Sequence, residues 1–125
     1  MVLSRKLAKL EKIANGLGLI IVPGKQNAFI PADKTITVNT RQKPLKRAWN
    51  TAHEIGHAIT LSRCIQEMGQ RALTGADREW PSLESEFRAW RETDKIMRKL
   101  GLFTDGYLKY KHQCIRSYYC LSKTD

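Results

Sequence analysis

The sequence predicts an α+β domain in which a small three-stranded sheet stands among four helices. Two observations predict this class: apolar residues recur at helical spacing in four stretches, and three short apolar or alternating runs lie between the first two stretches. The chain has 125 residues, a length at which one domain buries roughly two thirds of its unfolded surface and needs no disulfide. We therefore expect residues 1–125 to form a single domain.

The N-terminal part predicts one helix and then three strands. Residues Leu3–Ala14 favour a helix, because apolar and basic side chains fall on opposite sides, and Asn15-Gly16 favours its end. The third strand is predicted from strict alternation of polar and apolar residues, most of them β-branched. The three predicted strands are Leu19–Val22, which Pro23-Gly24 stops, Ala28–Ile30 and Thr35–Asn39.

Three longer helical patterns follow. The first begins at Pro44, since proline is tolerated in the first turn of a helix. A polar, glycine-containing segment, Glu67–Asp77, favours a loop, and Gly101 favours the end of the second helix. The predicted helices span Pro44 to Leu61, Ser82 to Leu100, and Tyr107 to Leu121.

The chain is strongly basic. Its 22 lysines and arginines outnumber 12 acidic residues, which gives a formal charge of +10. Such a charge attracts acidic proteins or nucleic acid, although it also serves solubility alone. Many basic residues lie in Arg41–Arg47 and on the outer faces of the predicted helices. We expect an acidic or DNA-associated protein as the partner, with direct nucleic-acid binding through the basic C-terminal tail as an alternative.

Three further features bear on location. The sequence has no apolar run of the roughly 18 residues that a membrane-spanning helix needs, so we expect no membrane association. The basic N-terminus is not followed by an apolar region with a cleavage site, so no secretory signal is predicted. The three cysteines cannot all pair within the chain, which favours a reducing cytoplasm.

One motif carries chemistry. His53-Glu54-Ile55-Gly56-His57 has the form HExxH and falls inside the predicted Pro44–Leu61 helix. The two histidines stand one turn apart on one face, where both imidazoles can bind one Zn²⁺ ion. Glu54 is angled off the metal axis and can reach a water in the open coordination position, as a general base must. Gly56 costs about 1 kcal/mol relative to alanine in a helix interior, which indicates that another element packs closely there.

A third protein ligand is expected from the Ser82–Leu100 helix, since catalytic zinc usually has three protein ligands. Glu84 is in line with a charged face, whereas Glu86 shares its side with apolar residues and needs a partner there. We choose Glu86 as the ligand and keep Glu84 as the alternative. Asp94 is a candidate acceptor for a ligand-histidine N–H. The apolar residues placed on the Glu86 side are Leu83, Phe87, Trp90 and Met97.

These residues resemble a known family. The segment Thr51-Ala52-His53-Glu54-Ile55-Gly56-His57-Ala58, followed by Glu-x-Glu-x-x-x-aromatic at Glu84 to Trp90, is similar to the ImmA/IrrE-type zinc metallopeptidases over about residues 1 to 100. Those proteins have minimal zincin-like domains, are commonly carried by phages and mobile elements, and act on repressors or related regulators. The resemblance implies a gluzincin-like peptidase with one catalytic zinc, His53, His57 and Glu86 as ligands, and Glu54 as base.

The resemblance also implies how a substrate binds. The strand before the zinc helix, here Thr35–Asn39, would lie at the cleft edge and pair with an extended substrate backbone. In the implied mechanism zinc polarises the scissile carbonyl, and Glu54 moves a proton from water to the leaving amine. Tyr107 and Tyr110 are candidate donors to the oxyanion, although tyrosines in such helices usually serve packing.

Some alternatives remain open. His112, Cys114 and Cys120 match no common zinc motif, and we expect core or surface residues rather than a second metal site. The tail residues that could contact nucleic acid belong to no recognised binding motif; they are Lys109, Lys111, Arg116, Tyr118 and Tyr119. The second functional hypothesis is a zinc-containing regulatory or binding module with little protease activity, in one form associated with nucleic acid.

Overall fold

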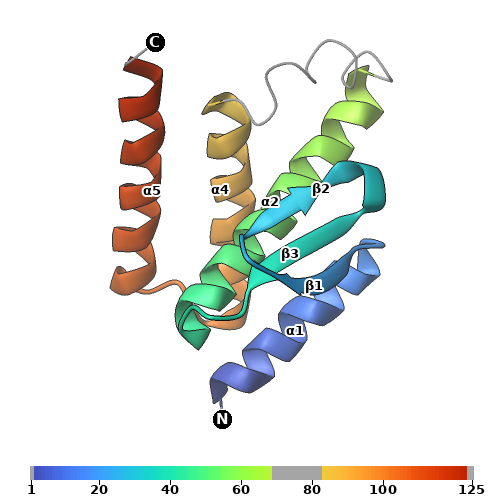
Figure 1. The fold of residues 1–125 in the computed structure, drawn as a ribbon, viewed down its shortest axis with the longest axis vertical. Helices are drawn as coiled ribbons and strands as arrows, with labels where there is room; N and C mark the ends of the chain where they lie inside the picture. The colour runs from blue at the N-terminus through green and yellow to red at the C-terminus, as the bar shows by residue number, and fades with distance from the viewer. Residues whose placement is uncertain (1, 69–82, 124–125) are drawn as a thin grey trace.

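A computed structural model describes residues 2–68 and 83–123 of the chain (Figure 1). They form an α+β fold with four helices and a three-stranded sheet, as the sequence predicts. The elements in chain order are α1 (Val2–Gly16), β1 (Ile20–Gly24), β2 (Ala28–Ile30), a short 3₁₀ turn (Pro31–Asp33), β3 (Thr35–Asn39), α2 (Pro44–Met68), α4 (Leu83–Leu100) and α5 (Asp105–Lys123).

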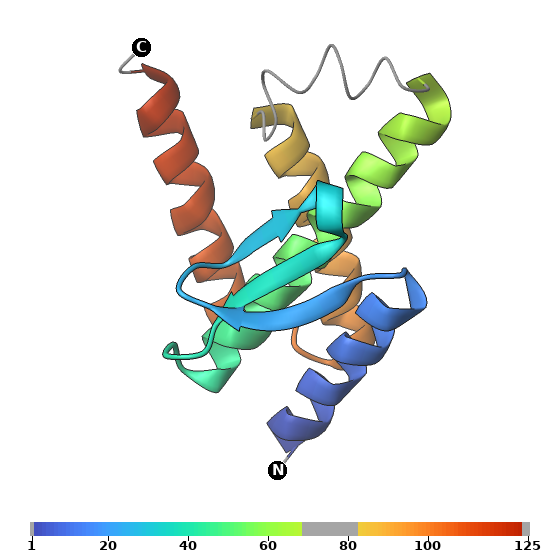
Figure 2. The same cartoon turned by 45° about the vertical axis from the view of Figure 1, so that its right-hand side comes forward.

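The sheet has the order β1-β3-β2, with β3 in the middle (Figure 2). β1 runs parallel to β3, and β2 runs antiparallel to it, with Phe29 opposite Ile36. The alternation predicted for β3 is confirmed, because Ile36 and Val38 are buried while the threonines between and beside them are half-buried. The two edges of the sheet are therefore β1 and β2, and β3 has no open edge.

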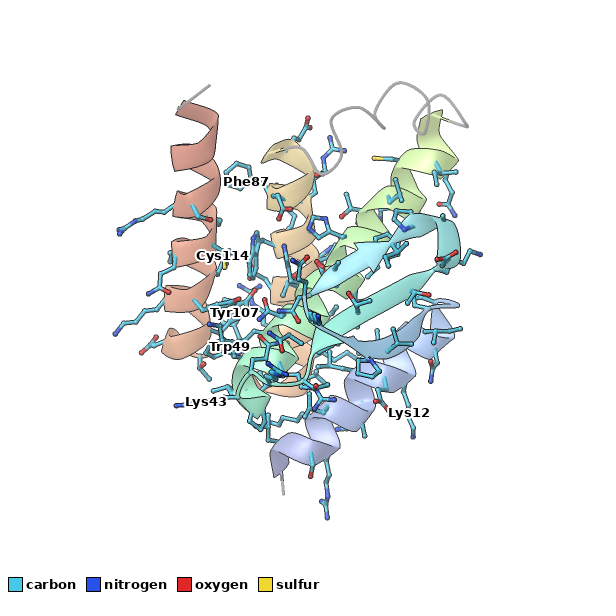
Figure 3. The ribbon with its side chains drawn as sticks, viewed as in Figure 1. Lys12, Lys43, Trp49, Phe87, Tyr107 and Cys114 are labelled. Carbon is cyan, nitrogen blue, oxygen red and sulfur yellow. The ribbon has the colours of Figure 1, made fainter. Side chains whose placement is uncertain are left out.

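The helices pack on both sides of α2. The sheet and α1 contact one side of α2, whereas α4 runs along its other side in the most extensive contact of the fold (Figures 1 and 2). α5 stands beside α4, and Tyr107 of α5 is fully buried on the side that faces α4 (Figure 3). Gly101 ends α4 with φ +70°, and Leu102 N–H bonds to the Met97 carbonyl, as in a Schellman cap.

Two predicted boundaries and one predicted side-chain placement are corrected. β1 includes Pro23 and Gly24, which is possible because an edge strand tolerates the missing proline N–H. α2 continues seven residues past Leu61 to Met68, so the predicted loop begins too early; the rest of that loop lies largely outside the described residues. Phe87 does not join the buried face of α4 but projects toward α5 with 37% of its surface exposed (Figure 3).

None of the helices within residues 2–68 and 83–123 combines the length and apolar composition that crossing a bilayer requires.

Candidate metal site and cleft

The middle of α2 presents the HExxH residues from a buried position. Ala52 and Ile55 are fully buried and hold this part of α2 in the core. His53, Glu54 and His57 are themselves at least nine-tenths buried. The helical spacing predicted from the motif is therefore present, and the side chains do not stand on an ordinary exposed surface.

Glu86 of α4 meets both histidines. Its Oε2 lies 2.9 Å from His53 Nε2, and its Oε1 lies 3.0 Å from His57 Nε2. One ligand atom from each of the three residues falls within 4.8 Å of the others, and all three residues are buried. Glu84, two residues earlier, lies outside this group: its side chain is 73% exposed and pairs with Arg88 at 2.6 Å. Of the two carboxylates considered from the sequence, only Glu86 is brought to the histidines.

Gly56 allows α2 and α4 to approach closely at this point. A Cβ atom on Gly56 would lie 2.4 Å from the Ala89 carbonyl oxygen and 3.0 Å from Thr93 Oγ1. Backbone atoms cannot yield as a flexible side chain can, so only glycine fits this contact. The close packing predicted from the glycine is thus confirmed, and its effect is to bring Glu86 within reach of α2.

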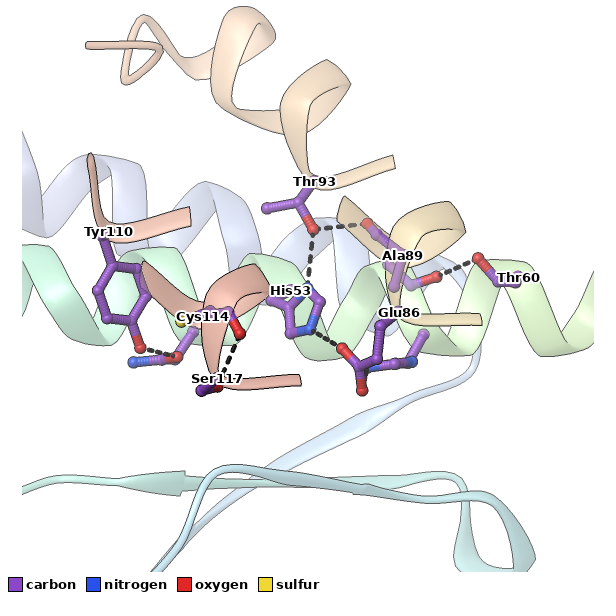
Figure 4. A network of polar contacts seen from close by, with 11 residues as sticks. His53, Thr60, Glu86, Ala89, Thr93, Tyr110, Cys114 and Ser117 are labelled. Carbon is purple, nitrogen blue, oxygen red and sulfur yellow. Dashed lines mark hydrogen bonds and ion pairs between the residues drawn. The ribbon is translucent and has the colours of Figure 1, made fainter. Parts of the chain in front are cut away.

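Thr93 orients His53 from the far side of the ring (Figure 4). Its hydroxyl donates to the Ala89 carbonyl at 2.7 Å, so its oxygen can only accept from His53 Nδ1, which lies 3.4 Å away. With a metal on Nε2, this arrangement would favour protonation of Nδ1. In this structure Nε2 lies within hydrogen-bond distance of Glu86 Oε2. Asp94, the acceptor considered from the sequence, instead binds Tyr107 Oη at 2.6 Å and Lys111 Nζ at 2.7 Å.

Trp90 covers the same histidine. Its ring stacks on His53 with centroids 3.9 Å apart and planes inclined by 22°. Trp90 is 1% exposed, so it excludes water from this side of the imidazole. Burial accordingly lowers the pKa of His53, although its bond to Glu86 opposes the effect. A neutral imidazole is the form that binds a metal.

The pKa values of the two buried carboxylates, Glu86 and Glu54, are shifted in opposite directions. Burial alone would raise the pKa of Glu86, but the hydrogen bonds with His53 and His57, together with their charges, lower it to about 2. Burial raises the pKa of Glu54 to about 7, with an opposing effect of His57 and a further rise caused by Glu86. Glu54 Oε2 is buried and has no hydrogen-bond partner among the described residues. Glu86 is therefore held as an anion, whereas Glu54 can exchange a proton near neutral pH.

These side chains line a cleft of about 770 Å³. One wall is formed by α2 and α4, and the other by β2 with the loop before it and by Tyr110 and Cys114 of α5. Within the described part of the chain the edge strand at the cleft is β2, and β3 is the central strand, so the assignment of Thr35–Asn39 as the edge strand is wrong. The sequence predicts β3 as a strand but not its pairing, and β2 folds back onto the side of β3 nearer the cleft.

Hydrogen-bonded side-chain amides connect the loop before β2 with Tyr110 of α5, the two parts of the cleft wall opposite α4. Gln42 donates to Asn27 Oδ1 at 2.9 Å and accepts from Asn50 Nδ2 at 3.0 Å. Tyr110 Oη donates to Asn50 Oδ1 at 2.6 Å (Figure 4). Both tyrosines considered as oxyanion donors thus already donate their hydroxyl protons, Tyr107 to Asp94 and Tyr110 to Asn50. Only Tyr110 lines the cleft.

The C-terminal residues considered as metal ligands or as nucleic-acid contacts do not form a second site within the described residues. Among the described residues, His53, His57 and Glu86 form the one group suited to a metal, and neither His112 nor Cys114 joins it. Cys64 and Cys114 carry no disulfide. Lys111 forms a largely buried ion pair with Asp94, so its ammonium group is not presented to nucleic acid. The side chains of Cys120, Tyr118 and Tyr119 lie outside what the structure describes.

Sequence reasoning missed two residues that the site uses. Thr93 lies seven residues after Glu86, and Asn50 lies three residues before His53, so helical spacing places each on the face of a predicted ligand. That spacing can be read from the sequence. What the sequence could not supply was the separation of the two helices, which decides whether Thr93 reaches His53.

The donor set fits a metal ion. Two imidazole nitrogens and a carboxylate held as an anion are the ligands of many zinc sites. Among the described residues only three donors converge, and they do so in an open cleft. The chain matches no family model, no curated protein and no solved structure in the comparisons made.

Proposed function

We propose that the chain is a zinc-dependent metallopeptidase that hydrolyses peptide bonds in a protein substrate. The observation that carries the proposal is the convergence of His53, His57 and Glu86 in a cleft that also holds the unpartnered carboxylate oxygen of Glu54. Structural zinc sites are usually closed by four protein ligands, whereas catalytic sites keep a position open. Three converging donors in an open cleft favour the catalytic alternative over a module that keeps zinc for structure.

The proposed residues divide the work as follows. His53, His57 and Glu86 would hold the ion, which when bound acts as a Lewis acid toward the scissile carbonyl and acidifies a water. Glu54 Oε2 would take a proton from the attacking water and give it to the leaving amine nitrogen, while the hydroxide part of the water bonds to the carbonyl carbon. Thr93 and Trp90 keep the His53 ring in one orientation, and Trp90 keeps water from its far face.

The substrate is proposed to be an extended polypeptide at the β2 edge. An edge strand offers unpaired backbone groups to another chain, and β2 stands at the cleft. Lys25 lines the cleft, and Lys46 lies over the Tyr110 ring at 5.4 Å. Together with the charge of +10, these lysines favour an acidic substrate, such as an acidic region of a DNA-associated regulator.

The proposal is tested by searching for new protein N-termini. A cell extract is incubated with the zinc-loaded protein, with Glu54→Gln and with Glu84→Gln, and new N-termini are identified by mass spectrometry. New termini are expected with the wild type and with Glu84→Gln but not with Glu54→Gln. Identical termini from Glu54→Gln, or none from a fully zinc-loaded wild type, would contradict the proposal.

A further inference from the structure

A second hollow lies next to the cleft, along α2 toward its C-terminal end. It measures about 290 Å³, and we call it the apolar groove. Phe29 of β2 lines both hollows, so the groove and the cleft adjoin at this side chain. On α2, His57 lines the cleft, and Ala58 and Leu61 line the groove.

The chemistry of the groove differs from that of the cleft. The cleft is lined by the proposed metal ligands, amides and a lysine, whereas the groove has one charged residue, Lys34, among the described residues that line it. Its apolar lining includes Leu17, Leu19, Phe29, Ile59, Leu61 and Ile65. Leu17 is 48% exposed at its rim. Contiguous apolar surface of this kind marks a binding site more often than scattered apolar residues do.

The position of the groove indicates what occupies it. An extended chain that lies along β2 over His53 and His57 and continues along α2 passes over the groove. The axial distance from His57 to Leu61 is about 6 Å and to Ile65 about 12 Å. An extended chain covers these distances in about two to four residues.

We propose that the apolar groove is a specificity site, which takes one large apolar side chain of the polypeptide bound in the cleft. That side chain belongs to a residue about two to four positions from the bond that lies over the histidines. The inference rests on the proposed function, since it presupposes a peptide in the cleft. It adds a requirement that the catalytic residues do not impose, namely an apolar residue at a fixed place in the substrate.

The groove is tested by peptide selection on an inactive protein. A displayed library of random peptides is selected on zinc-loaded Glu54→Gln, so that binding is read without cleavage. Selected peptides are expected to share a leucine, isoleucine, phenylalanine or methionine at one position. Ser62 lines the groove and is exposed, so Ser62→Trp fills the groove without disturbing the core. It is expected to weaken the selected peptides about ten-fold or more, whereas His112→Trp, on exposed α5 surface, leaves them unchanged.

A second variant guards against loss of the fold. Ile65→Asn makes the groove wall polar and is expected to remove the apolar preference, with the zinc content of both groove variants unchanged. Peptides without a fixed apolar position, or equal affinity for Ser62→Trp, would overturn the proposal. Concentration-dependent dimerisation that Ser62→Trp abolishes would also overturn it, because a second copy would then be the occupant. If the selected peptides need the apolar residue but the wild type does not cleave them, the peptidase proposal is refuted while the groove is confirmed as a binding site for an apolar side chain.

Discussion

The inner and outer faces of α4 carry glutamates only two residues apart, with opposite surroundings. On the inner face, Glu86 is buried, contacts two histidines and has a pKa lowered to about 2. On the outer face, Glu84 is largely exposed and pairs with Arg88 one turn away. The difference teaches that the packing of α4 against α2, rather than residue type, selects which carboxylate takes part in the site.

The largest effect is expected from breaking the contact of the inner face with α2. Gly56→Ala forces its Cβ against the Ala89 carbonyl, so the two helices must separate. Overpacking of this kind typically costs about 1–3 kcal/mol, and the backbone contact places Gly56→Ala at the upper end. The free energy of unfolding in urea is the measurement. Gly16→Ala, whose Cβ would meet nothing within 4 Å, is the control, and equal losses in both variants would contradict the account.

A smaller effect concerns Glu54, the buried carboxylate of α2 that faces the same cleft. Its pKa is raised from 4.5 to about 7, so its protonated form stabilises the fold at low pH, and this contribution is lost as pH rises from about 4.5 through 7. In the metal-free protein, Glu54→Gln should therefore be more stable than the wild type above about pH 7. The gain should be of order 1 kcal/mol per unit of the shift and vanish below about pH 4.5.

The check is the free energy of unfolding of both metal-free proteins across this pH range. A Glu54→Gln advantage that grows as the pH falls would have the wrong sign.

Thr93 is expected to have a moderate effect on metal binding. Thr93→Val removes the oxygen that accepts from His53 Nδ1, and loss of such a partner typically weakens metal affinity about 10–100-fold. Because the contact is 3.4 Å long, the lower end of this range is expected. Competition with a zinc chelator measures the affinity. Thr93→Ser, which keeps the hydroxyl, should bind zinc nearly as the wild type does; if both variants weaken equally, the methyl group and not the hydroxyl is responsible.

The outer face should give the smallest effect. Arg88→Ala breaks an exposed ion pair with Glu84, and such pairs contribute about 0–1 kcal/mol. Zinc content should not change. A loss of zinc in Arg88→Ala would show that the outer face also shapes the site, and the contrast between the faces would fail.

Much of this arrangement follows from the sequence, because it depends on local periodicity. The HExxH spacing places His53 and His57 on one face, and the apolar side of α4 distinguishes Glu86 from Glu84. Gly56 also indicates a close helix contact, because it stands inside a strongly helical pattern. These inferences need only the helix repeat and the cost of an unpaired buried charge.

The rest depends on contacts between distant segments. The strand order puts β2 rather than Thr35–Asn39 at the cleft, and no local pattern specifies that pairing. Asp94 reaches Tyr107 and Lys111 because α5 packs beside α4, which leaves Thr93 to contact His53. Phe87 is one residue, about 100° around the helix, from Glu86, and this rotation is enough to expose it.

The central claim is that His53, His57 and Glu86 hold one metal ion, and zinc stoichiometry of purified variants tests it most directly. Glu86→Ala and Glu84→Ala each remove a glutamate carboxylate from α4, the first from its inner face and the second from its outer face. The account predicts one zinc per chain in the wild type and in Glu84→Ala, and loss of most of it in Glu86→Ala and His53→Ala. Stoichiometric zinc in His53→Ala or Glu86→Ala, or its loss in Glu84→Ala, would contradict the claim.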